Sequence, residues 1–308
     1  MQATLQGLSR TLTLPFADNM KHCILTMDVE DWYHLDYFER QKCDSSVSML
    51  DGIEFFLSFL QRHDLPSSFF VLGELAKGSA RHQLSQIQEA GHEIASHGWS
   101  HQRPLTMTKK EFLEDLKRSK CEIEDVVGGP VEGYRAPCFS IDRACLDAVL
   151  ATGHSYDSSR ILFDAHPLYG SVDLKGFEQI SSEIFRDGDF FEFQVSTLSL
   201  FGRNIPVSGG GYLRIFPWPL MKWLLSNYLR KHEFYVLYIH PFELSTKPIP
   251  TLPGDTRWMT RRRFKAGRKN VEAKLDKLVE LLKGNGFSFT TFSALRNKLM
   301  KFNANPEG

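Results

Sequence analysis

Short apolar runs alternate with amphipathic segments over most of the chain, and this alternation limits the fold more than any other feature of the sequence. The runs are rich in β-branched and aromatic residues, as strands are. We predict strands at 22–28, 67–73, 92–97, 190–196 and 234–240, with strand-like segments at 128–140 and 287–293. We predict helices at 46–63, 108–127, 142–151, 220–231 and 270–286, and one that ends near residue 90. Such alternation is typical of β-α units around a mainly parallel sheet, so we expect an α/β fold.

Local end signals support three of these helices. Thr108 and Glu111 form a Thr-x-x-Glu capping box, and Ser48 with Asp51 resembles one. Gly91 follows the helix that ends near residue 90, and glycine adopts the left-handed conformation of a helix C-cap without strain.

The composition is that of an ordinary globular protein. Of 308 residues, 42% are hydrophobic and 24% are charged, and 37 basic residues balance 37 acidic ones. A formal charge of zero gives no global field that favours nucleic acid or an anionic membrane. The first twenty residues do not have the basic and apolar regions of a secretion signal, and no run of eighteen apolar residues occurs. We therefore predict a cytoplasmic protein with no membrane span and no nucleic-acid partner.

The segment "SHGWSH" (96–101) places two histidines four residues apart, a spacing that allows both imidazoles to bind one metal ion. Alone, such a pair is more often structural in a chain with eleven histidines. Its position in the predicted fold adds weight to the metal interpretation, because the loops that follow parallel strands converge on one face of a β/α fold. The residues that fall where a predicted strand ends are Asp28, His97, Arg135 and His240. We expect these side chains in one site.

The segment "TMDVEDWYH" (26–34) carries carboxylates on Asp28, Glu30 and Asp31 just after an apolar strand. Close anions repel unless a cation or proton compensates, which favours a metal nearby; a solvated loop with helix-capping carboxylates is the structural alternative. A catalytic zinc site needs about three protein ligands, and one carboxylate with two imidazoles meets that count. Glu30 shares a face with Asp28 if the strand continues, whereas Asp31 is suited if the chain has already turned, so both stay open. A separate carboxylate must act as base, and we assign Asp28 to that role.

Five motifs in a fixed order carry a resemblance to a known family. They are the Asp-led segment at 28–31, "HGWSH", "YRAPCFS", "YDSS" and "LYIHPFE". Over residues 22–245 the chain resembles the polysaccharide deacetylase family, whose members are metal-dependent carbohydrate esterases that remove N-acetyl groups from amino sugars. The resemblance implies a distorted (β/α) barrel. It also implies a catalytic domain at 22–245 with an N-terminal extension at 1–21 and a C-terminal extension, 246–308, packed on the same domain.

The resemblance implies a role for each matching residue. Asp28 would take a proton from the attacking water, and Arg135 would hold that carboxylate through charge-assisted hydrogen bonds. His240 would protonate the leaving amine, and Asp157 would keep the imidazole of His240 charged and aligned. The backbone N–H near Cys138 would stabilise the oxyanion of the tetrahedral intermediate.

The same resemblance implies the metal ligands. His97 and His101 resemble the metal-binding histidines, and either Glu30 or Asp31 would complete the set. We expect Zn²⁺, with Co²⁺, Ni²⁺ or Fe²⁺ as alternatives that accept the same donors. The Asp-Val-Glu-Asp sequence replaces the usual adjacent Asp-Asp pair. It is similar to a branch of the family associated with bacterial exopolysaccharide or surface-glycan synthesis, lipopolysaccharide included.

We therefore predict an enzyme that removes an N-acetyl group from an amino sugar in a polysaccharide, an oligosaccharide or an activated precursor. The alternative is hydrolysis of another amide, in an N-formyl sugar or an allantoin-like ureide. A catalytically silent glycan-binding module would have lost the base or the acid, and this chain keeps Asp28 and His240. The basic run 257–269 has the residue types that contact phosphates. Without a base-stacking module, we interpret it as a solvated helix start or loop.

Overall fold

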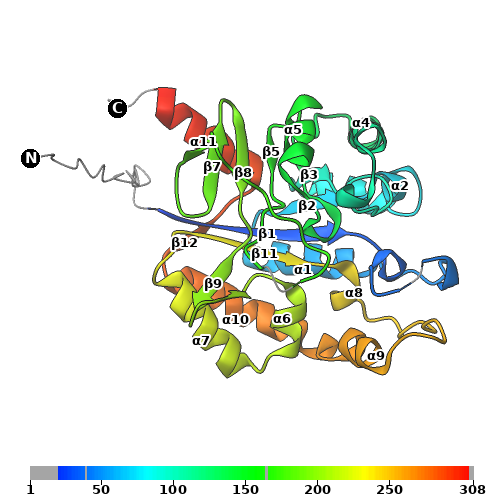
Figure 1. The fold of residues 1–308 in the computed structure, drawn as a ribbon. Helices are drawn as coiled ribbons and strands as arrows, with labels where there is room; N and C mark the ends of the chain where they lie inside the picture. The colour runs from blue at the N-terminus through cyan, green and yellow to red at the C-terminus, as the bar shows by residue number, and fades with distance from the viewer. Residues whose placement is uncertain (1–19, 39, 164–165, 305–308) are drawn as a thin grey trace, which may run out of the picture.

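A mainly parallel sheet forms the centre of the molecule (Figure 1). The computed structural model describes residues 20–38, 40–163 and 166–304. The parallel strands, in spatial order, are β11 (Phe234–Ile239), β1 (Lys21–Val29), β2 (Ser68–Val71), β3 (Glu93–Ser96), β4 (Gly133–Tyr134), β5 (Tyr156–Asp157) and β8 (Phe190–Phe193). Helices cover the outside of this sheet, so the fold is α/β, as the sequence predicts.

The sheet curves into a distorted (β/α) barrel that is closed by single contacts instead of a continuous ladder. Ser196, just after β8, accepts a hydrogen bond from Val236 N of β11 on its Oγ (3.0 Å). Ser208 O accepts from Tyr238 N of β11 at 2.9 Å. Because only isolated bonds join β11 to the segments that follow β8, this part of the barrel is irregular.

The described residues form five further strands, of which β12 is also parallel to its neighbour. β12 (Phe287–Phe289) pairs with the first residues of β1, on the edge that β2 occupies farther along. β7 (Ile184–Asp187) and β6 (Glu178–Gln179) continue the sheet beyond β8 in antiparallel directions. β9 (Thr197–Leu200) and β10 (Arg203–Pro206) form a separate hairpin.

The helices fill the connections between strands. The α-helices are α1 (Gly52–His63), α2 (Gly73–Lys77), α3 (Arg81–Glu89), α4 (Lys109–Val127), α5 (Arg143–Ala151), α6 (Gly210–Ile215), α7 (Trp218–Leu229), α8 (Pro241–Leu244), α9 (Trp258–Lys265), α10 (Val271–Gly284) and α11 (Phe292–Ala304). The short 3-10 helices are η1 (Trp32–His34), η2 (Arg40–Lys42), η3 (Pro104–Thr106), η4 (Pro137–Phe139) and η5 (Arg268–Asn270).

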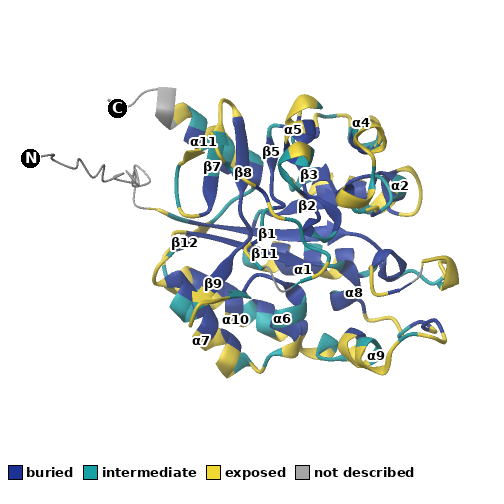
Figure 2. Ribbon diagram, viewed as in Figure 1, coloured by how far each residue is buried: buried dark blue, intermediate teal, exposed yellow. Residues whose placement is uncertain are grey.

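Strand β1 is buried along nearly its whole length, and alternation along it separates two apolar layers (Figure 2). Cys23, Leu25 and Met27 pack with α1, α7 and α10 in the layer between sheet and helices. Ile24 belongs to a second cluster with aromatic residues from β2 and β8. Because side chains alternate along a strand, Asp28 shares the face of Ile24, so the apolar pattern of β1 places this carboxylate.

The helix-end signals in the sequence predicted two of the three helix ends correctly. The capping box of Thr108 and Glu111 is confirmed, and Gly91 adopts a φ of +76° just after α3. The box at Ser48 and Asp51 is wrong, because Asp51 makes no side-chain cap and α1 begins only at Gly52. The Asp51 carboxylate instead accepts hydrogen bonds from Ser245 Oγ (2.7 Å) and Thr246 N (3.1 Å), which lie beyond α8.

The C-terminal part of the chain contributes to the same core. β12 pairs with β1, and α10 packs in the apolar layer that also contains β1. The predicted strand at 287–293 is too long, because α11 begins at Phe292. The predicted N-terminal extension lies almost entirely outside the described residues. Across the described ranges, no helix combines the length and the apolar character needed to cross a bilayer.

Candidate active site

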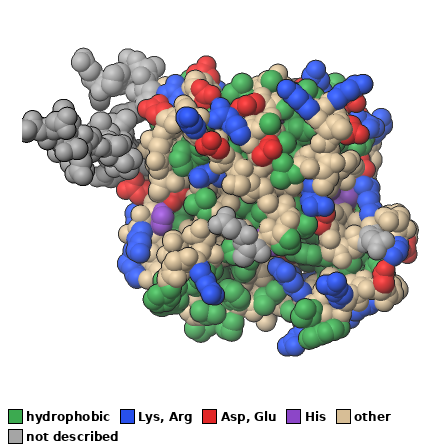
Figure 3. All heavy atoms as spheres, viewed as in Figure 1, with side chains coloured by type: hydrophobic (Ala, Val, Ile, Leu, Met, Phe, Trp, Pro, Cys, Tyr) green, Lys and Arg blue, Asp and Glu red, His purple; other side chains and the backbone are tan. Residues whose placement is uncertain are grey.

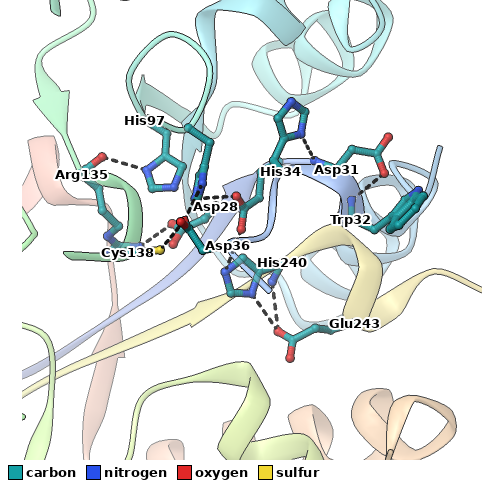
Figure 4. Close-up of polar contacts among 12 residues, drawn as sticks. Asp28, Asp31, Trp32, His34, Asp36, His97, Arg135, Cys138, His240 and Glu243 are labelled. Atoms are coloured by element: carbon teal, nitrogen blue, oxygen red, sulfur yellow. Dashed lines mark hydrogen bonds and ion pairs between the residues drawn. The ribbon is translucent and has the colours of Figure 1, made fainter. Parts of the chain in front are cut away.

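Three of the residues predicted at strand ends, Asp28, His97 and His240, line one pocket, and Arg135 lies buried beside Asp28 (Figure 4). Asp28 is the last residue but one of β1, His97 follows β3, Arg135 follows β4 and His240 follows β11. The parallel direction of these strands brings their carboxyl ends to the same edge, which explains why residues far apart in sequence meet there.

Asp28 and Arg135 form a buried ion pair. Arg135 Nη1 lies 2.7 Å from Asp28 Oδ1 and donates a second hydrogen bond to Thr26 Oγ1 at 2.7 Å. The guanidinium is fully buried and is fixed from its other side by Ser158, whose carbonyl and hydroxyl oxygens accept from Nε and Nη2 at 3.0 Å each. It also lies 4.0 Å from the centre of the Phe70 ring. Arg135 therefore holds the carboxylate in one orientation.

Glu30, His97 and His101 offer ligand atoms that all lie within 4.8 Å of one another. His97 Nδ1 is bonded to Arg135 O at 2.8 Å, which leaves its Nε2 available. Glu30 Oε2 lies 2.7 Å from His101 Nε2, yet this buried oxygen makes no hydrogen bond. Such a contact is expected for two ligand atoms directed at a common third point and not at each other. The donor set of two imidazoles and one carboxylate fits a divalent cation.

The charges in this group favour a cation. Burial opposes ionisation of Glu30, but the neighbouring His101 outweighs it and lowers the pKa of Glu30 to about 2. Burial lowers the pKa of His97 to about 4, which keeps this imidazole neutral and able to act as a ligand. For His101 burial acts in the same direction, but Glu30 and Asp36 reverse it and raise its pKa to about 10. The carboxylates around His101 thus stabilise positive charge at this point.

The loop that carries the two histidines is held from both sides. Asp115 of α4 accepts a hydrogen bond from Trp99 N at 3.0 Å, and Gly73 N of α2 donates to Gly98 O at 2.9 Å. A Cβ at Gly73 would lie 2.7 Å from the Trp99 ring, so only glycine allows this approach. Trp99 therefore packs within the fold, with the Arg118 guanidinium 3.5 Å from its ring centre, and is not a free platform for a sugar.

Of the two carboxylates that the sequence leaves open, only Glu30 lies with the histidines. Asp31 Oδ1 accepts hydrogen bonds from Trp32 N and Met49 N, both at 2.8 Å, and caps η1. Figure 4 shows Asp31 turned toward Trp32 and away from His97. The structural alternative of a helix-capping carboxylate thus describes Asp31, and the metal interpretation fits Glu30.

His240 is paired with Glu243, a residue to which the sequence assigned no role. Glu243 Oε2 lies 3.3 Å from His240 Nδ1 and accepts from His240 N at 3.1 Å. Its other oxygen lies 3.2 Å from Arg214 Nε. Burial would lower the pKa of His240, but Glu243 first and Glu30 second raise it to about 9. The His-x-x-Glu spacing, which closes a capping box at α8, is the signal that sequence reasoning missed.

Asp157 is not placed where the resemblance implied. Its oxygens accept from Ser159 Oγ (2.8 Å) and Ser159 N (2.9 Å), and it lies opposite Glu192 of the neighbouring β8. Ser159 Oγ in turn accepts from Ala136 N at 2.8 Å. Asp157 therefore braces the loop that carries Arg135, and the alignment of His240 that was predicted for Asp157 falls to Glu243.

Two parts of the chain match known protein families. Residues 50–156 match the polysaccharide deacetylase family. The chain carries a polysaccharide deacetylase domain. Residues 158–296 match a second family, described as a domain of unknown function (DUF3473).

Two curated relatives of the deacetylase domain are named for glycans. The peptidoglycan deacetylase of Helicobacter pylori is 32% identical over 121 residues, which cover 39% of this chain and 41% of the relative. Chitin deacetylase 1 of Cryptococcus neoformans is 27% identical over 143 residues, 41% of this chain and 30% of the relative. The chain thus spans less than half the length of these relatives.

Solved structures share the fold of the deacetylase domain. A Mycobacterium smegmatis protein, provisionally assigned as a polysaccharide deacetylase, superposes with a TM-score of 0.62 at 17% identity over 96% of both chains. A family 4 carbohydrate esterase pseudoenzyme of Bacillus anthracis superposes with a TM-score of 0.52 at 14% identity, over 90% of this chain and 66% of the other. At these identities the likeness concerns the fold alone.

The site draws on more of the chain than the deacetylase match covers. His97, His101 and Arg135 lie inside the match, whereas Asp28 and Glu30 precede it. His240, Glu243 and Arg214 belong to the domain of unknown function. The second family therefore supplies the imidazole that faces the pocket and the groups that hold it.

The pocket wall is largely aromatic. Phe139 makes edge contacts with Tyr169 and Tyr238, whose ring centres lie 5.4 and 4.9 Å away. Cys138 lines the same pocket with a left-handed backbone (φ +54°), and its N–H makes no hydrogen bond to any residue of the described ranges. Its thiol donates to Asp36 Oδ2 at 2.9 Å, and that oxygen also lies 3.4 Å from His101 Nδ1. Asp36 is a further residue at the site that sequence reasoning missed.

The Asp157–Glu192 pair makes stability depend on pH. Burial first, and then the charge of Glu192, raises the pKa of Asp157 well above its usual value, and burial also raises the pKa of Glu192. An acid with a raised folded-state pKa binds its proton more tightly when folded. The free energy of unfolding therefore falls as pH rises from about 4 toward the folded pKa.

Replacing Glu192 by glutamine is expected to reduce this fall, because one ionisable partner is removed while Arg160 N keeps its acceptor. Chemical denaturation at pH 5 and pH 8 measures the effect. The variant should retain about 1 kcal/mol or more of the unfolding free energy that the parent loses between these values. Glu178→Gln, at an exposed carboxylate on β6, is the matched control. An unchanged pH dependence in Glu192→Gln would show that the pair carries no shared proton.

Proposed function

We propose that this protein is a metal-dependent deacetylase that removes an N-acetyl group from an amino sugar in a glycan or a glycan precursor. One observation carries the proposal. The Asp28–Arg135 pair and the His240–Glu243 pair face the same pocket, beside the group of Glu30, His97 and His101. A base, an acid and a set of metal ligands are the groups that hydrolysis of an amide by water requires.

Glu30, His97 and His101 would hold the metal, with zinc as the first candidate and cobalt, nickel or iron as alternatives. A divalent ion supplies Lewis acidity, which polarises the amide carbonyl and makes water a stronger acid. The neutral His97 and the ionised Glu30 are in the protonation states that ligands need, whereas His101 would release its proton when it binds the metal.

The side chains supply the proton transfers. Asp28 accepts a proton from the attacking water while Arg135 holds its carboxylate in place. The N–H of Cys138 donates to the oxygen that becomes negative when water adds to the carbonyl carbon. The C–N bond then breaks, and His240 gives its proton to the leaving amine nitrogen. Glu243 keeps His240 charged before this step, since it favours the imidazolium form.

A glycan substrate is supported by the aromatic pocket wall and by the names of the curated relatives. Phe139, Tyr169 and Tyr238 present ring faces and edges of the kind that pack against sugars. The exopolysaccharide or surface-glycan setting and the cytoplasmic location stay predictions. A silent binding module is disfavoured, because it would not need both Asp28 and His240 at one pocket.

The decisive experiment pairs metal content with acetate release. The purified protein is analysed for bound metal and is then incubated with N-acetylglucosamine oligomers before chelation, after chelation and after zinc is added back. We expect about one metal per chain and acetate release that chelation abolishes and zinc restores. N-formyl sugars and allantoin test the alternative amides in parallel. Turnover of one of these without acetate release would replace the proposed substrate, and a protein that binds no metal under reconstitution would overturn the proposal.

A further inference from the structure

The most exposed large apolar side chains of the described residues lie in two segments outside the pocket. They are Phe201 (94% exposed), Trp258 (68%), Met259 (62%) and Trp223 (49%). Phe201 connects the strands of the β9–β10 hairpin, Trp223 lies on α7 beside that hairpin, and the other two begin α9. An exposed apolar side chain is ordinary when it stands alone, but clustering on neighbouring elements marks an interaction surface.

The same two segments carry a net positive charge although the whole chain is neutral, because both lack acidic residues and the second is rich in arginine and lysine. Residues 193–232 and 256–271 contain no aspartate or glutamate. Their basic residues are Arg203, Arg214, Lys222, Arg230, Lys231, Arg257, Arg261, Arg262, Arg263, Lys265, Arg268 and Lys269. Because the chain has equal numbers of acidic and basic residues, the acidic residues that balance these lie elsewhere in the sequence.

Several of these cations are available to a partner. Arg261 and Arg268 are engaged, since they donate to backbone carbonyls such as Thr256 O (3.0 Å) and Phe242 O (2.8 Å). The exposed side chains for which the described part of the chain shows no hydrogen bond or ion pair include those of Lys222, Arg257, Arg262, Lys265 and Lys269. We call these five residues, together with Phe201, Trp223, Trp258 and Met259, the basic-aromatic face.

Figures 1 and 3 place this face relative to the rest of the molecule. Helix α7 lies at the lower left of the view and α9 at the lower right, and the lower edge shows apolar and basic side chains with few acidic ones. The α9 part of the face adjoins the pocket, because Arg263 of α9 lines the pocket. Arg214 of α6 is bonded to the carbonyl oxygens of Arg263 (2.7 Å) and Phe264 (3.2 Å), which fixes α9 beside α6.

We propose that the basic-aromatic face docks on an anionic lipid surface. Exposed tryptophans flanked by lysines and arginines are the composition of interfacial segments, in which the rings enter the headgroup region and the cations meet lipid phosphates. A soluble polyanion would require the cations alone, so it gives no reason for Phe201, Trp258 and Met259 to be exposed. The inference goes beyond the deacetylase function, because it concerns where the protein is held and not which bond it cleaves. Docking would place the pocket close to glycans carried on lipids.

Vesicle binding tests the proposal without any catalytic readout. The probes are vesicles of phosphatidylcholine alone and of phosphatidylcholine mixed with phosphatidylglycerol, with binding measured by co-sedimentation and by tryptophan fluorescence. We expect binding to the anionic vesicles, with a blue-shifted emission, and much weaker binding to the neutral ones. Arg262→Glu/Lys265→Glu should weaken binding by about 25-fold or more, since each basic residue at such a surface contributes about fivefold. Trp258→Ser/Met259→Ser should weaken it by about tenfold or more.

Two control variants match these changes on other elements. Lys109→Glu/Lys110→Glu reverses exposed charges on α4, and Leu105→Ser/Leu150→Ser removes exposed apolar side chains near α4 and on α5. Both should bind within about twofold of the parent. Circular dichroism and acetate release from a soluble oligosaccharide confirm that every variant is folded and active.

Two outcomes would overturn the proposal. The first is a failure of the parent protein to bind anionic vesicles at low salt. The second is equal binding by the parent and by Trp258→Ser/Met259→Ser, together with equal affinity of both for soluble dextran sulfate, which would define the face as a site for polyanions. Neither outcome bears on acetate release, so the deacetylase proposal stands or falls separately.

Discussion

Replacing Asp28 by asparagine is expected to lower kcat by a factor of about 10² to 10⁴ while the protein keeps its metal. Asparagine has nearly the same shape as aspartate, but it cannot accept the proton of the attacking water at neutral pH. The metal should remain, because the group of candidate ligands is Glu30, His97 and His101 and does not include Asp28. Metal analysis and steady-state kinetics on the same preparation measure both quantities.

Stability must be followed in this variant as well. Asp28 faces the fully buried Arg135, and removal of one partner of a buried ion pair costs about 3–5 kcal/mol. Thermal unfolding shows whether the variant is folded at the assay temperature. Loss of metal from a folded Asp28→Asn protein would make Asp28 a ligand and contradict its assignment as base.

Glu30→Gln and Asp31→Asn form a matched pair that should separate metal binding from capping. Glu30→Gln is expected to weaken metal binding by about 100-fold or more, with activity lost in proportion, because an amide is a poor substitute for a carboxylate ligand. Asp31→Asn should leave metal affinity within a few-fold of the parent. It should change the free energy of unfolding by no more than about 1 kcal/mol, since an asparagine Oδ1 can still accept from Trp32 N and Met49 N.

Competition with a chromogenic chelator gives the metal affinity of each variant, and chemical denaturation gives its stability. The two residues are adjacent and both are nearly fully buried, so a general disturbance of the segment would affect both variants alike. The opposite pattern, in which Asp31→Asn loses the metal and Glu30→Gln keeps it, would reverse the assignment of the ligand.

The α/β architecture was predictable because it depends on local periodicity. The apolar run of β1 and the helical spacing of apolar residues in α4 each indicate which side of the element is buried. Shorter elements have too few residues to show such a pattern. β5 has two residues, and the hairpin of β9 and β10 ends on the exposed Phe201. Neither carries enough periodicity to stand out in the sequence.

The candidate site was predictable where it depends on strand ends, and not where it depends on contacts between distant segments. Asp28, His97 and His240 follow apolar runs, so their convergence follows from parallel pairing. The choice between Glu30 and Asp31 required the position of Met49, which is distant in the sequence. The backbone N–H of Met49 donates a hydrogen bond to the Asp31 carboxylate.

The contacts of Asp157 could not be predicted for a similar reason. The family motif gave its position, but its neighbours Ser159 and Glu192 bind it to the loop of Arg135. Glu243 was visible in the sequence three residues after His240. Its burial beside Gly210, where an added Cβ would lie 2.1 Å from the carboxylate, was not visible.

The pairing of β1 has a consequence for the order in which the candidate site can assemble during synthesis. β1 is made before β11, which pairs with one of its edges, and the hydrogen bond from Thr26 to Leu237 joins positions 211 residues apart. Contacts between such distant residues form slowly, because the entropy of closing a long loop must be overcome first. Asp28 and Glu30 therefore spend most of translation on a strand without its final neighbour. The proposed site can therefore be completed only once β11 has folded, because a nascent chain that stalls before β11 holds Asp28 and Glu30 but lacks His240.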